Sequence, residues 1–184
     1  MKRVYVFVEG QTDEEFLRRV LPAEVTNETE IVRAGGSEGI TSLARSFLVR
    51  RRTPLAVLMD ADSLDQTVIE DRRESTEELI QAAAGSIPVK VVMVVPEIES
   101  WFFTVPEAIE RVLGGRPPDD LVALGSRDPK GILQQLSRQS KSVWDSSRAI
   151  RALEEQEIER LRARPDVTEL SQFLKKVLSE GKAA

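Results

Sequence analysis

Residues 4–10 read VYVFVEG, a short β-branched run that stops at Glu9-Gly10. Two later apolar runs also stop at acidic residues: residues 55–59 lead into Asp60-Ala61-Asp62, and residues 89–95 lead into Pro96-Glu97-Ile98-Glu99. Runs of this kind are typical of buried β-strands. If the three runs are neighbouring parallel strands, their acidic ends gather at one edge of one sheet, which is where open α/β sheets bind ligands.

The rest of the N-terminal half alternates helical patterns with strands. Residues 29–32 predict a further short strand, and apolar spacing predicts helices from a Thr12–Glu15 capping box to Pro22, around residues 40–48, and at 66–84. Ser75-Thr76-Glu77-Glu78 also suits a helix start, so a break there is the alternative to one continuous helix at 66–84. This order predicts an α/β fold, Rossmann-like, with a central, mostly parallel sheet flanked by helices.

The C-terminal half shows only helical patterns. Candidate helices cover residues 106–113, 129–139, 147–164 and 167–178, with Pro165 as a separator. We therefore expect an α/β core at residues 1–105 and a helical C-terminal extension at residues 106–184, packed on that core. The apolar stripe within residues 170–178 suits a helix that packs on its own domain, and a homodimer interface is the alternative.

Composition excludes several kinds of chemistry. The 184 residues contain neither cysteine nor histidine, which removes disulfides, thiolate zinc sites and imidazole catalysis. A formal charge of −5 argues against a broadly basic nucleic-acid surface. No apolar run approaches the roughly 20 residues that a membrane span needs, so a cytoplasmic protein without membrane contact is expected.

The acidic residues predict a site for a hard divalent cation. Carboxylates that cluster repel one another unless protons or cations neutralise them, and Mg²⁺ prefers oxygen ligands. Glu9, Asp60 and Asp62 are the main candidates, although an Asp-x-Asp sequence also suits an ordinary turn or helix cap. Asp13 is a further candidate, with stabilisation of a helix N-terminus as its alternative role.

Glu97 and Glu99 follow the last strand, and we expect at least one of them to contact the metal. The sequence does not distinguish between the two. Lys130 lies in the first turn of a helix capped by Asp128-Pro129, where a cation opposes the helix dipole. A phosphate or the carboxylate cluster would explain this position, and the alternative is a solvated surface lysine.

Four motifs resemble a known family. Val8-Glu9-Gly10-Gln11-Thr12-Asp13 resembles the first motif of Toprim domains, in the form found in OLD (overcoming lysogenization defect) nucleases and small Toprim-like proteins of bacterial defence loci, with Asp13 where a glutamate is usual. Asp60-Ala61-Asp62 resembles the second motif. The segment that begins at Pro96 resembles the acidic element that follows, and Asp128-Pro129-Lys130 resembles the downstream lysine element.

The resemblance implies a Toprim-like fold and a nuclease that uses one or two Mg²⁺ or Mn²⁺ ions to hydrolyse phosphodiesters in phage defence. It implies DNA in preference to RNA as the substrate, and a protein partner such as an ATPase. The catalytic residues would be Glu9, Asp60, Asp62 and Lys130. Two alternatives stay open: a non-catalytic or partner-dependent binding module, and a haloacid-dehalogenase-like phosphohydrolase with the first aspartate of Asp-x-Asp as nucleophile.

Overall fold

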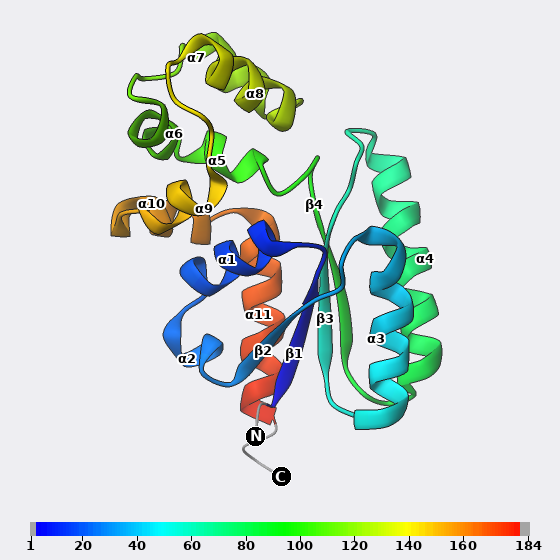
Figure 1. Cartoon of the computed structure of the whole chain (residues 1–184). Coiled ribbons are helices and arrows are strands. Elements are labelled where there is room, and N and C mark those ends of the chain that lie inside the picture. The colour runs from blue at the N-terminus through cyan, green and yellow to red at the C-terminus, as the bar shows by residue number, and fades with distance from the viewer. Residues whose placement is uncertain (1–2, 181–184) are drawn as a thin grey trace.

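The computed structural model describes residues 3–180 and contains one parallel sheet surrounded by helices (Figure 1). The strands are β1 (Val4–Val8), β2 (Thr29–Arg33), β3 (Leu55–Asp60) and β4 (Val89–Val94). The helices are α1 (Gln11–Val20), α2 (Ala23–Thr26), α3 (Ser37–Arg51), α4 (Gln66–Ala84), α5 (Ser100–Thr104), α6 (Pro106–Leu113), α7 (Asp119–Gly125), α8 (Pro129–Gln139), α9 (Ser146–Arg151), α10 (Glu155–Arg162) and α11 (Pro165–Glu180).

The strand order β2-β1-β3-β4 confirms the predicted α/β fold with a parallel sheet. In the register, Val6 lies opposite Ile31 of β2 and Ala56 of β3, and Leu58 lies opposite Val92 of β4. The chain places β2 on one side of β1 and then crosses to place β3 on the other side. The strand order therefore reverses between β1 and β3, and such a switch point opens a crevice outside the carboxyl ends of the two strands.

Each face of the sheet is buried under a different set of helices. Val4, Val6 and Leu58 belong to a core shared with α1 and α11, whereas Phe7 and Val57 belong to a second core shared with α3 and α4. Because side chains alternate along a strand, Asp60 continues the series of Ala56 and Leu58. Asp60 therefore lies on the face of the sheet that α1 covers.

Helices α5 to α10 gather beyond the carboxyl ends of the strands, and α11 returns to pack on the sheet (Figure 1). The stripe on α11 is buried within the chain, since Leu170 and Leu174 have no exposed surface. Among the described residues, no helix is both long and apolar enough to cross a membrane.

The structure corrects two helix boundaries and decides one alternative. The predicted helix at 147–164 is two helices, because Glu157 accepts a hydrogen bond from the Glu154 amide at 2.7 Å and so begins α10 with a capping box. The helix at 66–84 is continuous, and the Ser75 hydroxyl donates to the Asp71 carbonyl inside α4. Pro165 begins α11 rather than preceding it, because proline suits the first turn of a helix.

Candidate metal centre

Glu9 links the ends of β1 and β3. Its Oε1 accepts a hydrogen bond from the Asp60 amide at 3.0 Å, and its own carbonyl accepts from the amides of Gly35 and Gly36 at 3.1 and 3.0 Å. Gly36 has a φ of 128°, a conformation that side chains other than glycine rarely adopt. Burial, with a contribution from the charge of Asp62, raises the pKa of Glu9 although the Asp60 amide and two cations oppose the rise.

Asp13 projects from the first turn of α1 toward the end of β1. Its Oδ2 accepts from the Gly10 amide at 3.1 Å, whereas its Oδ1 is buried and has no hydrogen-bond partner within residues 3–180. Burial, followed by the charges of Glu9 and Glu99, raises the pKa of Asp13 to about 6. Burying a carboxylate oxygen without a hydrogen-bond partner costs free energy, and a bound cation would offset that cost.

The predicted Thr12–Glu15 capping box is wrong by two residues. The residue before the helix is Gly10, and Asp13 closes the box through its bond to the Gly10 amide. Glu15 instead accepts a hydrogen bond from Gln11 Nε2 at 2.7 Å. The error arose because the helix begins at Gln11, directly after Gly10. The N-cap is therefore Gly10 instead of Thr12, and the third helical position is Asp13 instead of Glu15.

Asp60 is the most perturbed of the acids. It is 7% exposed, and its Oδ1 accepts a hydrogen bond from the Ile98 amide at 2.8 Å. Burial is the largest cause that raises its pKa to about 8, and the charges of Asp13, Glu9 and Glu99 add to the rise. The carboxyl therefore holds a proton at neutral pH unless a cation replaces that proton.

Asp62 lies on the turn that follows β3. Its φ of 52° is in the left-handed region, which aspartate tolerates better than most residues. The amides of Ala61 and Asp62 donate to the carbonyls of Val94 and Pro96, both at 2.9 Å. These bonds fix the turn after β3 against the segment after β4, and so bring Asp62 and Glu97 to the same place.

Glu97 and Glu99 lie just before α5 and face Lys130 at the start of α8. Lys130 Nζ is 2.6 Å from Glu97 Oε2 and 3.5 Å from Glu99 Oε2, and the Lys130 amide donates to Glu97 Oε1 at 3.1 Å. Asp128 caps α8 by accepting from the Gly131 amide. The carboxylate cluster thus explains why a cation occupies the first turn of this helix.

Lys130 and Glu99 shift each other's pKa. Burial raises the pKa of Glu99, and the nearby Lys130 limits that rise. Burial alone would lower the pKa of Lys130, but the hydrogen bond to Glu97 and the charge of Glu99 raise it above its ordinary value. Lys130 is therefore a permanent positive charge at this edge of the sheet.

The predicted site residues meet at the carboxyl edge but not all at one point. One oxygen atom from each of Asp60, Asp62 and Glu97 lies within 4.8 Å of the others, so this triad could hold a metal ion. Glu9 contacts Asp60 by accepting a hydrogen bond from the Asp60 amide. Asp13, Glu9 and Glu99 lie close enough for their charges to raise the Asp60 pKa.

Sequence reasoning missed Arg72, which lies in α4. Its Nη1 donates to the Ala61 carbonyl at 2.9 Å and to Asp62 Oδ2 at 3.1 Å. Ten residues separate Arg72 from Asp62, and their contact depends on how α4 leaves the turn. No motif carries that information, so only the folded chain identifies Arg72 as the counter-charge of Asp62.

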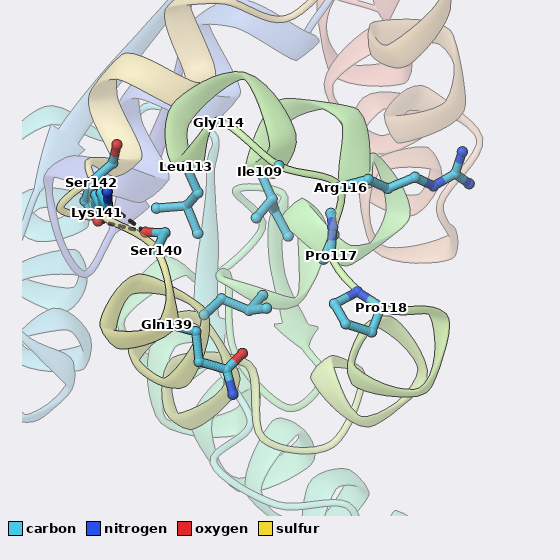
Figure 2. A pocket seen from close by; sticks show the side chains of 12 residues that line it. Ile109, Leu113, Gly114, Arg116, Pro117, Pro118, Gln139, Ser140, Lys141 and Ser142 are labelled. Atoms are coloured by element: carbon cyan, nitrogen blue, oxygen red, sulfur yellow. Dashed lines mark hydrogen bonds between the residues drawn. The ribbon is translucent and has the colours of Figure 1, made fainter.

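A cavity of about 420 Å³ lies away from these acids (Figure 2). It is enclosed by the end of α6, the loop at residues 114–118 and the end of α8. Ile109 and Leu113 line its apolar part, and Arg116 and Lys141 lie at its border. None of the acids of the metal centre lines it, so we assign the candidate site to the carboxyl edge of the sheet.

Comparison with known proteins adds a family but no activity. No curated protein and no solved structure matches the chain. One family matches residues 8–177, a range that contains every residue of the candidate metal centre. The chain belongs to this family, which is described as "Domain of unknown function (DUF4276)".

Proposed function

We propose that the protein is a Toprim-like nuclease that hydrolyses phosphodiesters with the help of Mg²⁺ or Mn²⁺. The observation that carries the proposal is the triad of Asp60, Asp62 and Glu97 at the carboxyl ends of β3 and β4, next to the switch point of the sheet and beside a buried Asp13 oxygen without a partner in residues 3–180. The motifs that resemble those of Toprim and OLD nucleases contain the acids of this cluster and Lys130, and this supports the same assignment.

In this proposal the triad forms the main ion site, and Glu9, Asp13 and Glu99 provide the remaining carboxylates for one or two ions. When bound, such ions activate water and offset the charge that develops on the scissile phosphate. The protein's own contribution is to hold the carboxylates in place through backbone amides: Ile98 for Asp60, Gly10 for Asp13 and Lys130 for Glu97.

Lys130 would contact a phosphate oxygen of the substrate. Its charge is permanent, it lies at the border of the acidic cluster, and its side chain is 58% exposed, so a phosphate can reach it from solvent. We further propose DNA as the substrate in preference to RNA, and a protein partner such as an ATPase, as the resemblance to OLD nucleases implies.

The test compares wild type with Asp60→Asn and Asp60→Ala. Supercoiled plasmid and single-stranded DNA are incubated with Mg²⁺ or Mn²⁺, and nicked or shortened products are measured. Asp119→Asn serves as a matched control, because Asp119 is an exposed acid on α7 outside the cluster. Wild type and Asp119→Asn should cleave and both Asp60 variants should not. Equal cleavage by all four proteins would refute the assignment.

A second function has an observation in its favour. Arg72 pairs with Asp62 and Lys130 pairs with Glu97, so two of the three triad carboxylates already have a positive neighbour without metal. This arrangement also suits a non-catalytic module that binds a partner. Calorimetry with Mn²⁺ separates the two functions: the nuclease requires binding that Asp60→Asn abolishes, whereas the scaffold requires none.

A further inference from the structure

A second cavity, of about 290 Å³, adjoins the metal centre. Glu99 and Lys130 line it from the metal side, and α8 and the segment at residues 143–146 form the rest of its wall. We call it the Trp144 pocket, after the aromatic residue in that segment. Because it shares two residues with the metal centre, a molecule that occupies this pocket lies directly beside the acids.

Trp144 is held firmly in the wall. Its amide donates to Ser137 Oγ at 3.0 Å, its Nε1 donates to Ser146 Oγ at 3.0 Å, and its ring meets Phe102 edge to face with centroids 4.8 Å apart. The adjacent Val143 is 84% exposed, and Leu133 completes the apolar part of the lining. An indole that is fixed and only partly covered is a stacking surface that needs no reordering when it binds a flat ligand.

Most of the polar lining comes from α8, and Glu99 and Ser146 supply the rest. Lys130, Gln134 and Arg138 are spaced four residues apart, so they follow one another along the helix. The Arg138 side chain is exposed, and within residues 3–180 it forms no ion pair or hydrogen bond. The two cations lie eight residues apart, which is roughly 12 Å along the helix axis, and the aromatic residue lies beside them.

We propose that the Trp144 pocket binds one unpaired base of single-stranded DNA whose backbone runs along α8. This inference rests on the proposed nuclease function and names its substrate class. Lys130 and Arg138 contact successive parts of the backbone, and the base stacks on Trp144. Aromatic residues beside a cationic track are how proteins hold single strands, whereas the bases of a duplex have both faces covered by their neighbours.

Binding is measured with full-length protein that carries Asp60→Asn, so that cleavage does not consume the probe. The probes are a labelled 12-nucleotide oligodeoxythymidylate and a duplex of the same length, followed by fluorescence anisotropy. Adding Trp144→Ala should weaken oligodeoxythymidylate binding roughly 10-fold, since stacking on an aromatic residue is worth about 1–3 kcal/mol per base, and should change duplex binding less than about 2-fold. Trp144→Phe keeps an aromatic ring and should retain most of the affinity.

Arg138→Gln gives a readout that a folding defect does not mimic. Loss of one phosphate contact should reduce the slope of log affinity against log salt by about 0.7 for a single strand. Arg116→Gln is the matched control, because Arg116 is a cation at the border of the other cavity (Figure 2), and its slope should not change. An unchanged slope in Arg138→Gln would overturn the backbone track.

The outcomes separate this inference from the nuclease proposal. If oligodeoxythymidylate binds through Trp144 but wild type with Mg²⁺ or Mn²⁺ cleaves nothing, the pocket stands and the nuclease proposal fails. If wild type cleaves, but Trp144→Ala binds the single strand as well as its parent, the pocket assignment fails. Absence of single-strand binding, or equal weakening for single strand and duplex, overturns it as well. Tighter binding of an RNA oligonucleotide of the same length would reject DNA as the ligand.

Discussion

Buried carboxylates have opposite surroundings at the start of α11 and at the carboxyl edge of the sheet. Asp166, at the start of α11, is 8% exposed and accepts from Arg164 at 3.1 and 2.8 Å, from Trp101 Nε1 at 3.1 Å and from the Val167 amide at 2.9 Å. Asp60 is equally buried, but its closest charged neighbours are other acids. Within residues 3–180, neither Asp60 nor Asp13 forms an ion pair.

The difference indicates what each region is for. A buried charge normally requires a partner of opposite sign and hydrogen bonds for its remaining atoms, and the Asp166 region supplies both. The carboxyl edge of the sheet leaves that requirement unmet at Asp60 and Asp13. This arrangement does not stabilise the fold, and it supports the proposal that the carboxyl edge holds a cation.

The largest effect on stability is expected where a paired charge loses its partner. Arg164→Met leaves Asp166 buried without its arginine and should lower the free energy of unfolding by about 3–5 kcal/mol. Urea denaturation measures the change, and Arg45→Met, at an exposed arginine on α3, is the control with a change of at most about 0.5 kcal/mol. The double variant Arg164→Met/Asp166→Asn removes the unpaired charge and keeps an acceptor for Trp101 Nε1, so it should recover much of the loss. A loss below about 1 kcal/mol in the single variant would contradict the contrast between the regions.

A divalent cation should stabilise the acidic edge by a comparable amount. At 100 times its dissociation constant, Mn²⁺ should raise the free energy of unfolding of wild type by about 2.7 kcal/mol, because it binds the folded chain. Thermal unfolding with Mn²⁺ and after chelation measures this difference. Asp60→Asn should lose the response and Asp119→Asn should keep it. A similar rise in all three proteins would indicate a cation effect unrelated to the cluster.

Without metal, Asp60→Asn should make the protein more stable at high pH. Because burial raises the Asp60 pKa from 3.8 to about 8, folding favours the protonated carboxyl, and that contribution is present below pH 4 and is lost as the pH rises through about 8. Each pKa unit corresponds to about 1.4 kcal/mol, so even a third of this shift would give the variant a gain of about 2 kcal/mol over wild type at pH 8. Denaturation of metal-free protein at pH 4, 6 and 8 should show the gain growing with pH. A gain of the same size at every pH would rule out titration of Asp60 as its cause.

The smallest effect on the free energy of unfolding is expected for the ion pairs of Lys130, which are more exposed than the pair of Arg164 with Asp166. Its side chain is 58% exposed, so its pairs with Glu97 and Glu99 should contribute less than about 1 kcal/mol. A double-mutant cycle of Lys130→Met and Glu97→Gln measures the coupling energy. A coupling above about 2 kcal/mol would place Lys130 with the structural pairs of the Asp166 region instead of with a substrate contact.

Much of the fold followed from local patterns in the sequence. The strands at Val4–Val8 and Leu55–Asp60 were recognisable because short apolar runs stop at acidic residues. Asp128-Pro129 correctly predicted the start of α8, since the cap and the proline each act within one turn. These signals depend only on residues that are neighbours in the sequence, so they can be recognised without the tertiary structure.

The partners of the charged residues could not be predicted in the same way. The pairs of Arg72 with Asp62, and of Arg111 with Glu157, join residues 10 and 46 positions apart. Each pair depends on the direction in which a helix leaves its turn and on which side chains fill the space beside it. For the same reason, the sequence placed Glu97 and Glu99 at the right edge without indicating that Glu97 is the one within the triad.

The position of α11 determines when the site can form during synthesis. Trp101, just after Glu99, is anchored by Asp166, and α11 covers the face of the sheet that Asp60 shares. A ribosome must therefore extend the polypeptide beyond residue 166 before Trp101 gains this anchor. Until then the segment that carries Glu97 and Glu99 lacks its contact with α11, so we expect a nascent chain that ends before α11 to hold these two acids less firmly.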